Sequence, residues 1–178
     1  WEEEETEVVQ YTSHQVSDPD NQGLLIHVEG KLEVEGGRVK GRYTLGATED
    51  INIKDDVTYV DENVHVLGLV SENDIVIDTD PWVVEDIEIH ASLMAISGSM
   101  YVKDYNDGVK RGTLRIFGGV IQNVRGAVGT GGASSNGTGY LKDYEFDSKL
   151  INIPPKSFPC TGNLKVIALF DSAALGNQ

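Results

Sequence analysis

One segment near the start of the chain has the spacing of a calcium-binding loop: Asp18, Asp20, Gln22, Gly23 and Glu29. Oxygen ligands on alternate residues around a glycine bend are typical of such loops, although Gln22 stands where Asp or Asn is usual. Pro19 interrupts the loop, and residues 24–28 read as a strand, which places Glu29 about 15 Å or more from Asp18. We therefore predict a turn into the first strand and no metal ion, with calcium binding as the alternative.

Five carboxylates alternate with aliphatic residues in the middle of the chain: Asp74, Asp78, Asp80, Asp86 and Glu88. Alternation places such side chains on the outer face of a strand. If neighbouring strands brought two of them within about 5–10 Å, the pair would have the separation used in glycoside hydrolysis. A chain with 29 acidic residues must expose many of them, however, so we predict a solvated outer face and no catalytic pair.

The four histidines are dispersed, without the i, i+4 spacing of a helical metal site: His14, His27, His65 and His90. His27 and His90 alternate with aliphatic residues, so we predict that both side chains face solvent, opposite a core of Ile and Val. Cys160 is the only cysteine, so the chain forms no internal disulfide, and no Cys or His lies at ligand spacing from it. These residues predict neither a zinc site nor a reactive thiol.

Residues 129–139 are rich in glycine but do not match a nucleotide-binding loop. They lack the Lys-Ser/Thr of a P-loop and the G-x-G-x-x-G pattern between a strand and a helix. Ser134 and Ser135 lack the context of a serine nucleophile, and Asn136-Gly-Thr138 matches the glycosylation acceptor pattern. We predict a mobile loop.

Four tyrosines have two interpretations: Tyr101, Tyr105, Tyr140 and Tyr144. They either form a strip that stacks on sugar rings, or cover the end of a stack of repeats, which needs a cap. The position of Tyr140 and Tyr144 near the end of the repeats favours capping. Overall, the sequence predicts no catalytic, cofactor-binding or metal-binding residue, and no cofactor.

The charge of the chain excludes several kinds of partner. Its 178 residues include 29 acidic and 14 basic side chains, for a formal net charge of −15. That charge repels phosphate backbones and anionic lipid surfaces, so we predict no binding to nucleic acid and no membrane contact. No apolar run reaches the roughly 18 residues needed to span a bilayer. Because the first residue is Trp1 instead of Met, we expect a piece of a longer protein, with any signal or anchor outside it.

The composition indicates short strands joined by tight turns. The chain holds 20 Val and 13 Ile against 13 Leu and 8 Ala, together with 20 Gly. Branching at Cβ favours the pleated surface of a sheet, whereas Leu and Ala favour helices. From residue 24 onward, short alternating apolar strings follow one another, and no stretch keeps a helical period over 11 residues.

An internal repeat defines the expected fold. Paired aliphatic anchors recur at Leu32/Val34, Ile51/Ile53, Ile75/Ile77, Met100/Val102 and, more weakly, Val120. The first anchors are 19, 24, 25 and 20 residues apart, a spacing typical of coils that stack about 4.8 Å apart. We therefore predict an all-β, single-domain, right-handed parallel β-solenoid with about 20–25 residues per repeat. Ile51, Ile75 and Met100 should point inward on successive coils, and a β-sandwich is the alternative.

The pattern of repeats and turns predicts four segments in the chain. Residues 1–22 form a capping strand or a frayed end, and residues 23–128 form the coils. Residues 129–139 are the glycine-rich loop, and residues 140–178 are a C-terminal capping segment and tail.

Several segments resemble a poorly characterised family of β-solenoid domains, found in prepilin-like surface proteins of bacteria that bear type IV pili. The resemblance begins in GKLEVEGGRVKGRYTLGATEDINIKDDVTYVD and covers about residues 23–170. It is most specific in the order of three segments, RGAVGT, GYLKDYEFD and PPKSFP. The hydrophobic N-terminal helix of that family is missing from the chain. The resemblance implies an extracellular location, with pilin or other cell-surface proteins as partners, and it supplies no catalytic residues.

Together these observations predict a non-catalytic structural and presentation module of a type IV pilus-associated surface protein. Two alternatives belong to other classes. One is a carbohydrate-active enzyme built on a β-helix, and the other is a binding module for a glycan, calcium or a partner pilin.

Overall fold

The computed structural model describes residues 23–131 and 137–159 of the chain. In this part, the secondary structure is almost entirely β-strand, with one short 3-10 turn, η1, at Ser148–Ile151. The strands are β1 (Leu24–Val28), β2 (Leu32–Val34), β3 (Gly37–Val39), β4 (Arg42–Ala47), β5 (Ile51–Ile53), β6 (Val57–Tyr59), β7 (Val66–Ser71), β8 (Ile75–Ile77), β9 (Ile87–Ala95), β10 (Met100–Val102), β11 (Lys110–Gln122) and β12 (Gly139–Phe146).

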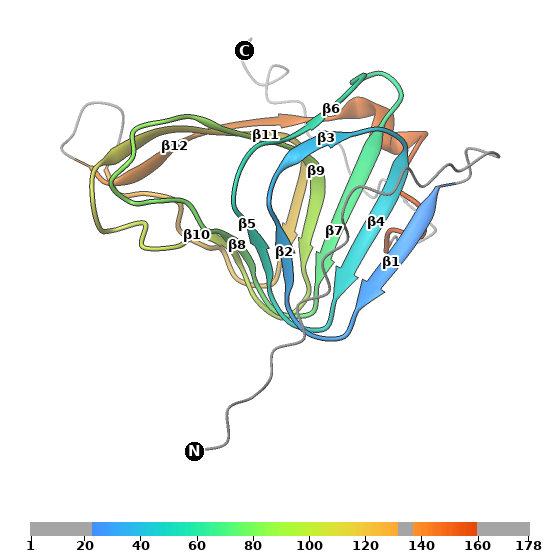
Figure 1. Cartoon of the computed structure of the whole chain (residues 1–178), viewed down its shortest axis with the longest axis horizontal. Helices are drawn as coiled ribbons and strands as arrows, with labels where there is room; N and C mark the ends of the chain where they lie inside the picture. The colour runs from blue at the N-terminus through green and yellow to red at the C-terminus, as the bar shows by residue number, and fades with distance from the viewer. Residues whose placement is uncertain (1–22, 132–136, 160–178) are drawn as a thin grey trace, which may run out of the picture.

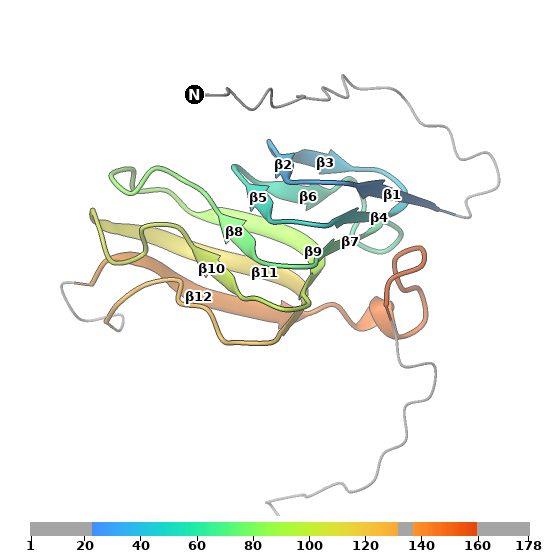
Figure 2. The same ribbon diagram turned by 90° about the horizontal axis from the view of Figure 1, so that it is seen from below.

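The strands stack in parallel to form the three faces of a β-solenoid (Figures 1 and 2). The first face runs β1, β4, β7 and then the second halves of β9 and β11. The second face runs β2, β5, β8 and β10. The third face runs β3, β6, the first halves of β9 and β11, and β12. The predicted all-β solenoid is confirmed.

The coil is right-handed. In Figure 1 the chain descends along β1 and β4, crosses to β2 and β5, rises, and returns through β3 and β6, which is a clockwise turn. Figure 2 places β1 at the edge that faces the viewer of Figure 1, and β12 at the far edge, so the chain recedes as it turns. Clockwise rotation away from the viewer defines the predicted hand.

The core is a set of aliphatic ladders that run along the solenoid axis. Leu32, Ile51, Ile75 and Met100 occupy one slot on successive coils of the second face, directly paired in register. Ile51, Ile75 and Met100 are buried, as predicted. The second anchor slot holds the partners that follow two residues later: Val34, Ile53, Ile77 and Val102.

The prediction for Val120 was wrong. Val120 pairs with Leu93 on the first face, so it does not continue the anchor ladder of the second face. The Val102 N–H donates to the Ala127 carbonyl at 3.0 Å, which places Val128 next in the second anchor slot. Val128 is buried with the rest of the core. The interval that follows Met100 is therefore longer than the predicted 20 residues. The prediction placed a turn at Gly118 and Gly119, but both residues lie inside β11.

β9 and β11 each span two faces, where the earlier coils use two separate strands. β9 pairs with β6 at Ile89 and with β7 from Ser92 onward, so it passes the corner between the third and first faces near Ala91. Gly118 pairs with Ala91, and a Cβ there would lie 1.9 Å from the Ala91 carbonyl oxygen. β12 then adds a further rung on β11.

The chain leaves the stack after β12 and runs back across the outside of the first face. We call residues 147–159 the strap. Its Pro154 carbonyl accepts a hydrogen bond from Arg42, and Phe158 packs against Gly68, where a Cβ would lie 2.3 Å from the ring. Gly68 leaves room for the ring on the outer surface between inward-facing Leu67 and Leu69. The strap therefore ties the last coil to the second and third coils.

Candidate interaction surface

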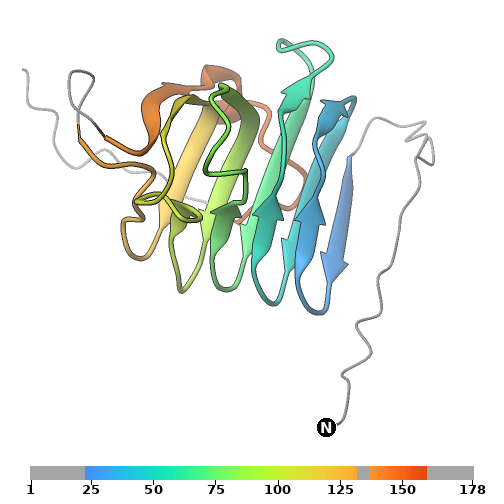
Figure 3. The same cartoon turned by 60° about the vertical axis from the view of Figure 1, so that its left-hand side comes forward.

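The loops that join the second face to the third differ most in length between coils, and we call their described parts the loop ridge. They are residues 35–36, 54–56, 78–86, 103–109, 129–131 and 137–138. The turns between the first and second faces, by contrast, are short and alike from coil to coil (Figure 3). In Figure 1 the loops that follow β8 and β10 extend well beyond β2 and β5. A solenoid tolerates such differences because its backbone ladder does not pass through the loops.

The most prominent feature of the loop ridge is an apolar tip at Trp82–Val84. Trp82 is 71% exposed and Val84 is 70% exposed, which is unusual for side chains of this size. The tip is held by its backbone. The Asp80 carboxylate accepts the Trp82 N–H at 2.8 Å, and the Pro81 carbonyl accepts the Val109 N–H at 3.0 Å. The indole is therefore presented on a turn that is hydrogen-bonded on both sides.

Gly108 allows the two long loops to meet. Its φ of +75° lies in the left-handed region, and a Cβ at this position would lie 1.9 Å from the Pro81 carbonyl oxygen. A larger residue would thus both strain the backbone and push the loop of Trp82 away. The loop that follows β10 therefore supports the loop that carries the tip.

Arg111 lies beneath the loop ridge and is fully buried. Its guanidinium donates to the Lys103 carbonyl at 3.0 Å, to the Asp104 carbonyl at 2.7 Å and to the Thr79 hydroxyl at 3.3 Å. It also lies 5.7 Å from the ring centroid of Tyr140. Arg111 thus joins both long loops to β12, and it fixes the carbonyl of Asp104, which has a positive φ of 49°.

Acidic side chains are numerous on the loop that carries the tip and on the loop that supports it. The two long loops carry five exposed carboxylates: Asp80, Glu85, Asp86, Asp104 and Asp107. One of them, Asp86, accepts the Thr113 N–H at 2.7 Å and so ties the loop of Trp82 to β11. An apolar centre with a negatively charged rim is complementary to an apolar pocket with a basic rim.

The carboxylates considered for catalysis are bound to separate partners. Asp74 precedes β8 and accepts the Ser99 N–H, whereas Asp78 follows β8 and forms ion pairs with Lys54 and Lys103. Burial alone would raise the pKa of the Asp78 carboxyl, but its hydrogen bonds and charge interactions with the two lysines outweigh burial and lower the pKa. Asp78 is thus held ionised, as part of a Lys54–Asp78–Lys103 ladder across three coils.

The prediction that His90 faces solvent was wrong. His90 is 3% exposed, because it lies at the corner of β9, where the side chains no longer alternate between core and solvent. Its ring packs edge-on between Tyr59 and Phe117, at centroid distances of 5.1 and 5.3 Å. Nδ1 accepts the Tyr59 N–H at 3.2 Å, which leaves Nε2 to donate to Glu88 at 3.1 Å.

Lys149 of the strap covers this corner. Its ammonium lies 4.5 Å from the Tyr59 ring centroid and 5.2 Å from that of Phe117, and it is paired with buried Asp147. Burial raises the pKa of the Tyr59 hydroxyl. The hydroxyl oxygen also accepts the Leu67 N–H, and this bond lowers the pKa and so offsets part of the rise. The corner is therefore a packed polar cluster that fixes the strap to the third face.

The other two histidines within the described part occupy separate places. His27 is exposed on β1, as predicted, and half-buried His65 accepts the Gly41 N–H at 3.0 Å through Nδ1. Glu29 is exposed directly after β1, which forms over the residues predicted as a strand. The remaining candidates lie outside the described residues: His14, Asp18, Asp20, Gln22, Ser134, Ser135, Asn136 and Cys160.

The four tyrosines lie in different environments and do not form one strip. Tyr101 lies on β10, Tyr105 packs against the core from the loop ridge, and buried Tyr140 donates to or accepts from Thr79. Tyr144 occupies the last strand beside Ile116 and is 43% exposed. Burial raises the pKa of the Tyr144 hydroxyl to about 12, with the charge of Arg125 acting against it. The glycine-rich loop is closed at its base by a bridge between Gly129 and Gly139.

In residues 23–131 and 137–159, no group of three or more His, Cys, Asp or Glu side chains is arranged to hold a metal ion. Within the same ranges, no helix has the length and hydrophobicity required to cross a bilayer. The predicted absence of a metal stays a prediction.

Comparison of the chain with protein-family models, with curated proteins and with solved structures found no match. The class of protein defined by the fold is therefore a right-handed parallel β-solenoid, and the resemblance to pilus-associated domains stays a prediction.

Proposed function

We propose that this domain is a non-catalytic structural and presentation module of an extracellular, type IV pilus-associated protein. The observation that carries the proposal is the apolar tip at Trp82–Val84, exposed on a hydrogen-bonded turn above a rigid stack of coils. An exposed Trp on a fixed turn loses little conformational freedom when it binds, which is a property of residues that dominate interfaces.

The proposed partner is a cell-surface protein, such as a pilin, with an apolar pocket and a basic rim. The five exposed carboxylates on the two long loops would favour that partner and repel acidic surfaces. The net charge of −15 acts in the same direction at long range, and it argues against nucleic acid as the partner.

Surface labelling tests the proposed setting. Antibodies against the domain should label intact cells of the source organism, and the label should coincide with pili. Cells that lack the pilus assembly machinery should lose the coincidence. Label that requires permeabilised cells would contradict the extracellular location.

A glycan-binding module is the second candidate, because one face of an exposed indole can stack on a sugar ring, and nearby carboxylates can accept hydrogen bonds from the hydroxyl groups of the sugar. Trp82 with Asp80 and Asp86 offers this combination. A panel of soluble polysaccharides distinguishes the candidates. Binding that is lost in Trp82→Ala and kept in Val124→Ala, which removes an exposed side chain outside the loop ridge, would favour the glycan.

A further inference from the structure

The described part of the solenoid ends in one coil at each side, and both coils expose strand edges. β1, β2 and β3 pair on one side only, with β4, β5 and β6, across the described residues. At the other end, residues 140–146 of β12 pair with β11 on one side, and residues 119–122 of β11 pair with β9 on one side, across the described residues. The strap runs outside the first face, and its Lys156 lies beside Gly23, where a Cβ would come within 2.9 Å of it. Unpaired parallel edges are templates for further strands.

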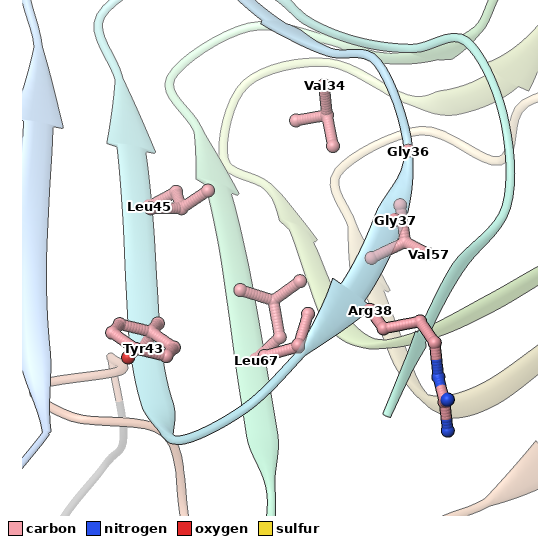
Figure 4. Close-up of a pocket in the computed structure, with 9 residues that line it drawn as sticks. Val34, Gly36, Gly37, Arg38, Tyr43, Leu45, Val57 and Leu67 are labelled. Atoms are coloured by element: carbon pink, nitrogen blue, oxygen red, sulfur yellow. The ribbon is translucent and has the colours of Figure 1, made fainter. Parts of the chain in front are cut away.

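The first coil also leaves the core open. An apolar pocket of about 220 Å³ lies at this end, and Figure 4 shows Val34, Tyr43, Leu45 and Leu67 around it. Gly36 and Gly37 form part of its wall, and a Cβ on Gly37 would meet no atom within 4 Å. The opening is thus wide enough for a side chain from another rung.

We propose that copies of this chain stack head to tail, with the last coil of one copy on the first coil of the next. Each end carries strands on the first and third faces, so the parallel ladders of these two faces can continue from one copy into the next. The contact joins unlike ends, which leaves a free end on every assembly and generates a filament instead of a closed ring.

The register of the strands supports a second copy as the occupant. On the third face, one column runs Arg38, Thr58, His90, Phe117 and Glu145. When the column continues into a second copy, Glu145 of one copy lies over Arg38 of the next, and both side chains are exposed. Opposite charges therefore meet at the contact.

The neighbouring columns match in size. Tyr144 is the last residue of the column that begins at Gly37, so its ring would lie over the open pocket of the next copy. Phe146 lies two residues further along β12 and is 59% exposed, and in the stack it would meet Val39 of the next copy. On the first face, Ile26 begins the column that ends at Val120, so aliphatic side chains meet there too.

Charge reversal at the two ends tests this proposal on the full chain. Sedimentation should show association of the wild type between about 1 µM and about 1 mM, a range typical of weak interfaces. Arg38→Glu alone and Glu145→Arg alone should each weaken association about tenfold or more, because like charges then face each other. An equimolar mixture of the two variants should recover it. Glu72→Arg makes the same change in net charge as Glu145→Arg on a middle coil, and it should associate like the wild type.

Three results would overturn the proposal. The first is a wild type that stays monomeric over the whole range, as it would if residues 1–22 of the same chain covered the first coil. The second is association that neither end variant changes, which would assign the contact to another surface. The third is a mixture that fails to recover the association lost by each variant alone.

Discussion

Replacing Arg111 with Ala tests how the loop ridge is held in place. The change removes a fully buried guanidinium that donates to the Lys103 and Asp104 carbonyls and to the Thr79 hydroxyl. Hydrogen bonds from a charged donor contribute about 1.5–3 kcal/mol each, so the three represent roughly 5–9 kcal/mol before desolvation is counted. Burial of the charge opposes them, and Nε has no partner within the described structure. We expect a net loss of about 3–5 kcal/mol in the free energy of unfolding, the range for removing one member of a buried charged network.

Arg115 on the same strand provides the matched control. Its side chain is 52% exposed and pairs with exposed Asp143 at 3.3 Å. Arg115→Ala should therefore cost at most about 1 kcal/mol, as exposed ion pairs do. Urea denaturation of both variants, monitored by circular dichroism, compares their free energies of unfolding. Arg111→Lys should fall between them, because an ammonium reaches the carbonyls without the fork of donors. Equal stability of Arg111→Ala and Arg115→Ala would refute the assigned role of Arg111.

Three further changes give separable results. Ile75→Ala empties a fully buried slot in the middle of the aliphatic ladder and should cost about 2–5 kcal/mol in urea denaturation, whereas stability like that of Val124→Ala would contradict the ladder. Asp78→Asn should cost about 0.5–1 kcal/mol at pH 7, because the lowered pKa keeps the native carboxyl ionised beside its two lysines. That difference should be full above the ordinary Asp value of 3.8 and vanish as the pH falls through the lowered pKa, so a difference that persists at the lowest pH would exclude the ion pairs as its cause. Trp82→Ala should change the free energy of unfolding by at most about 0.5 kcal/mol, since the side chain is 71% exposed, and a larger loss would mean that the tip is part of the core.

The repeat made most of the fold predictable. Aliphatic anchors at Ile51, Ile75 and Met100 recur at coil spacing because a parallel stack places the same slot of each coil in the core. The prediction failed where the backbone breaks the local rule. Gly118 and Gly119 look like a turn, but the stack carries β11 through them, and this moved the expected fifth anchor to Val120.

The candidate surface was much less predictable from the sequence. His90 alternates with aliphatic residues, yet Lys149 and two aromatic rings cover its corner from distant parts of the chain. Arg111 resembles any exposed basic residue in sequence, and only the three-dimensional arrangement of residues 79, 103 and 104 explains its burial. A signal for the apolar tip was present, since Pro81-Trp82-Val83-Val84 is an apolar run outside the anchor pattern, between two acidic stretches.

If the domain presents the tip at Trp82–Val84 to a cell-surface partner, as we propose, the tip should lie against that partner on intact cells. Site-specific photo-crosslinking on intact cells tests it most directly, with the photoreactive residue at Val84 and, as control, at Val124, which is 58% exposed outside the loop ridge. We expect a discrete adduct with an extracellular protein from position 84, and none from position 124. The absence of an adduct from position 84, or the same adduct from both positions, would contradict it.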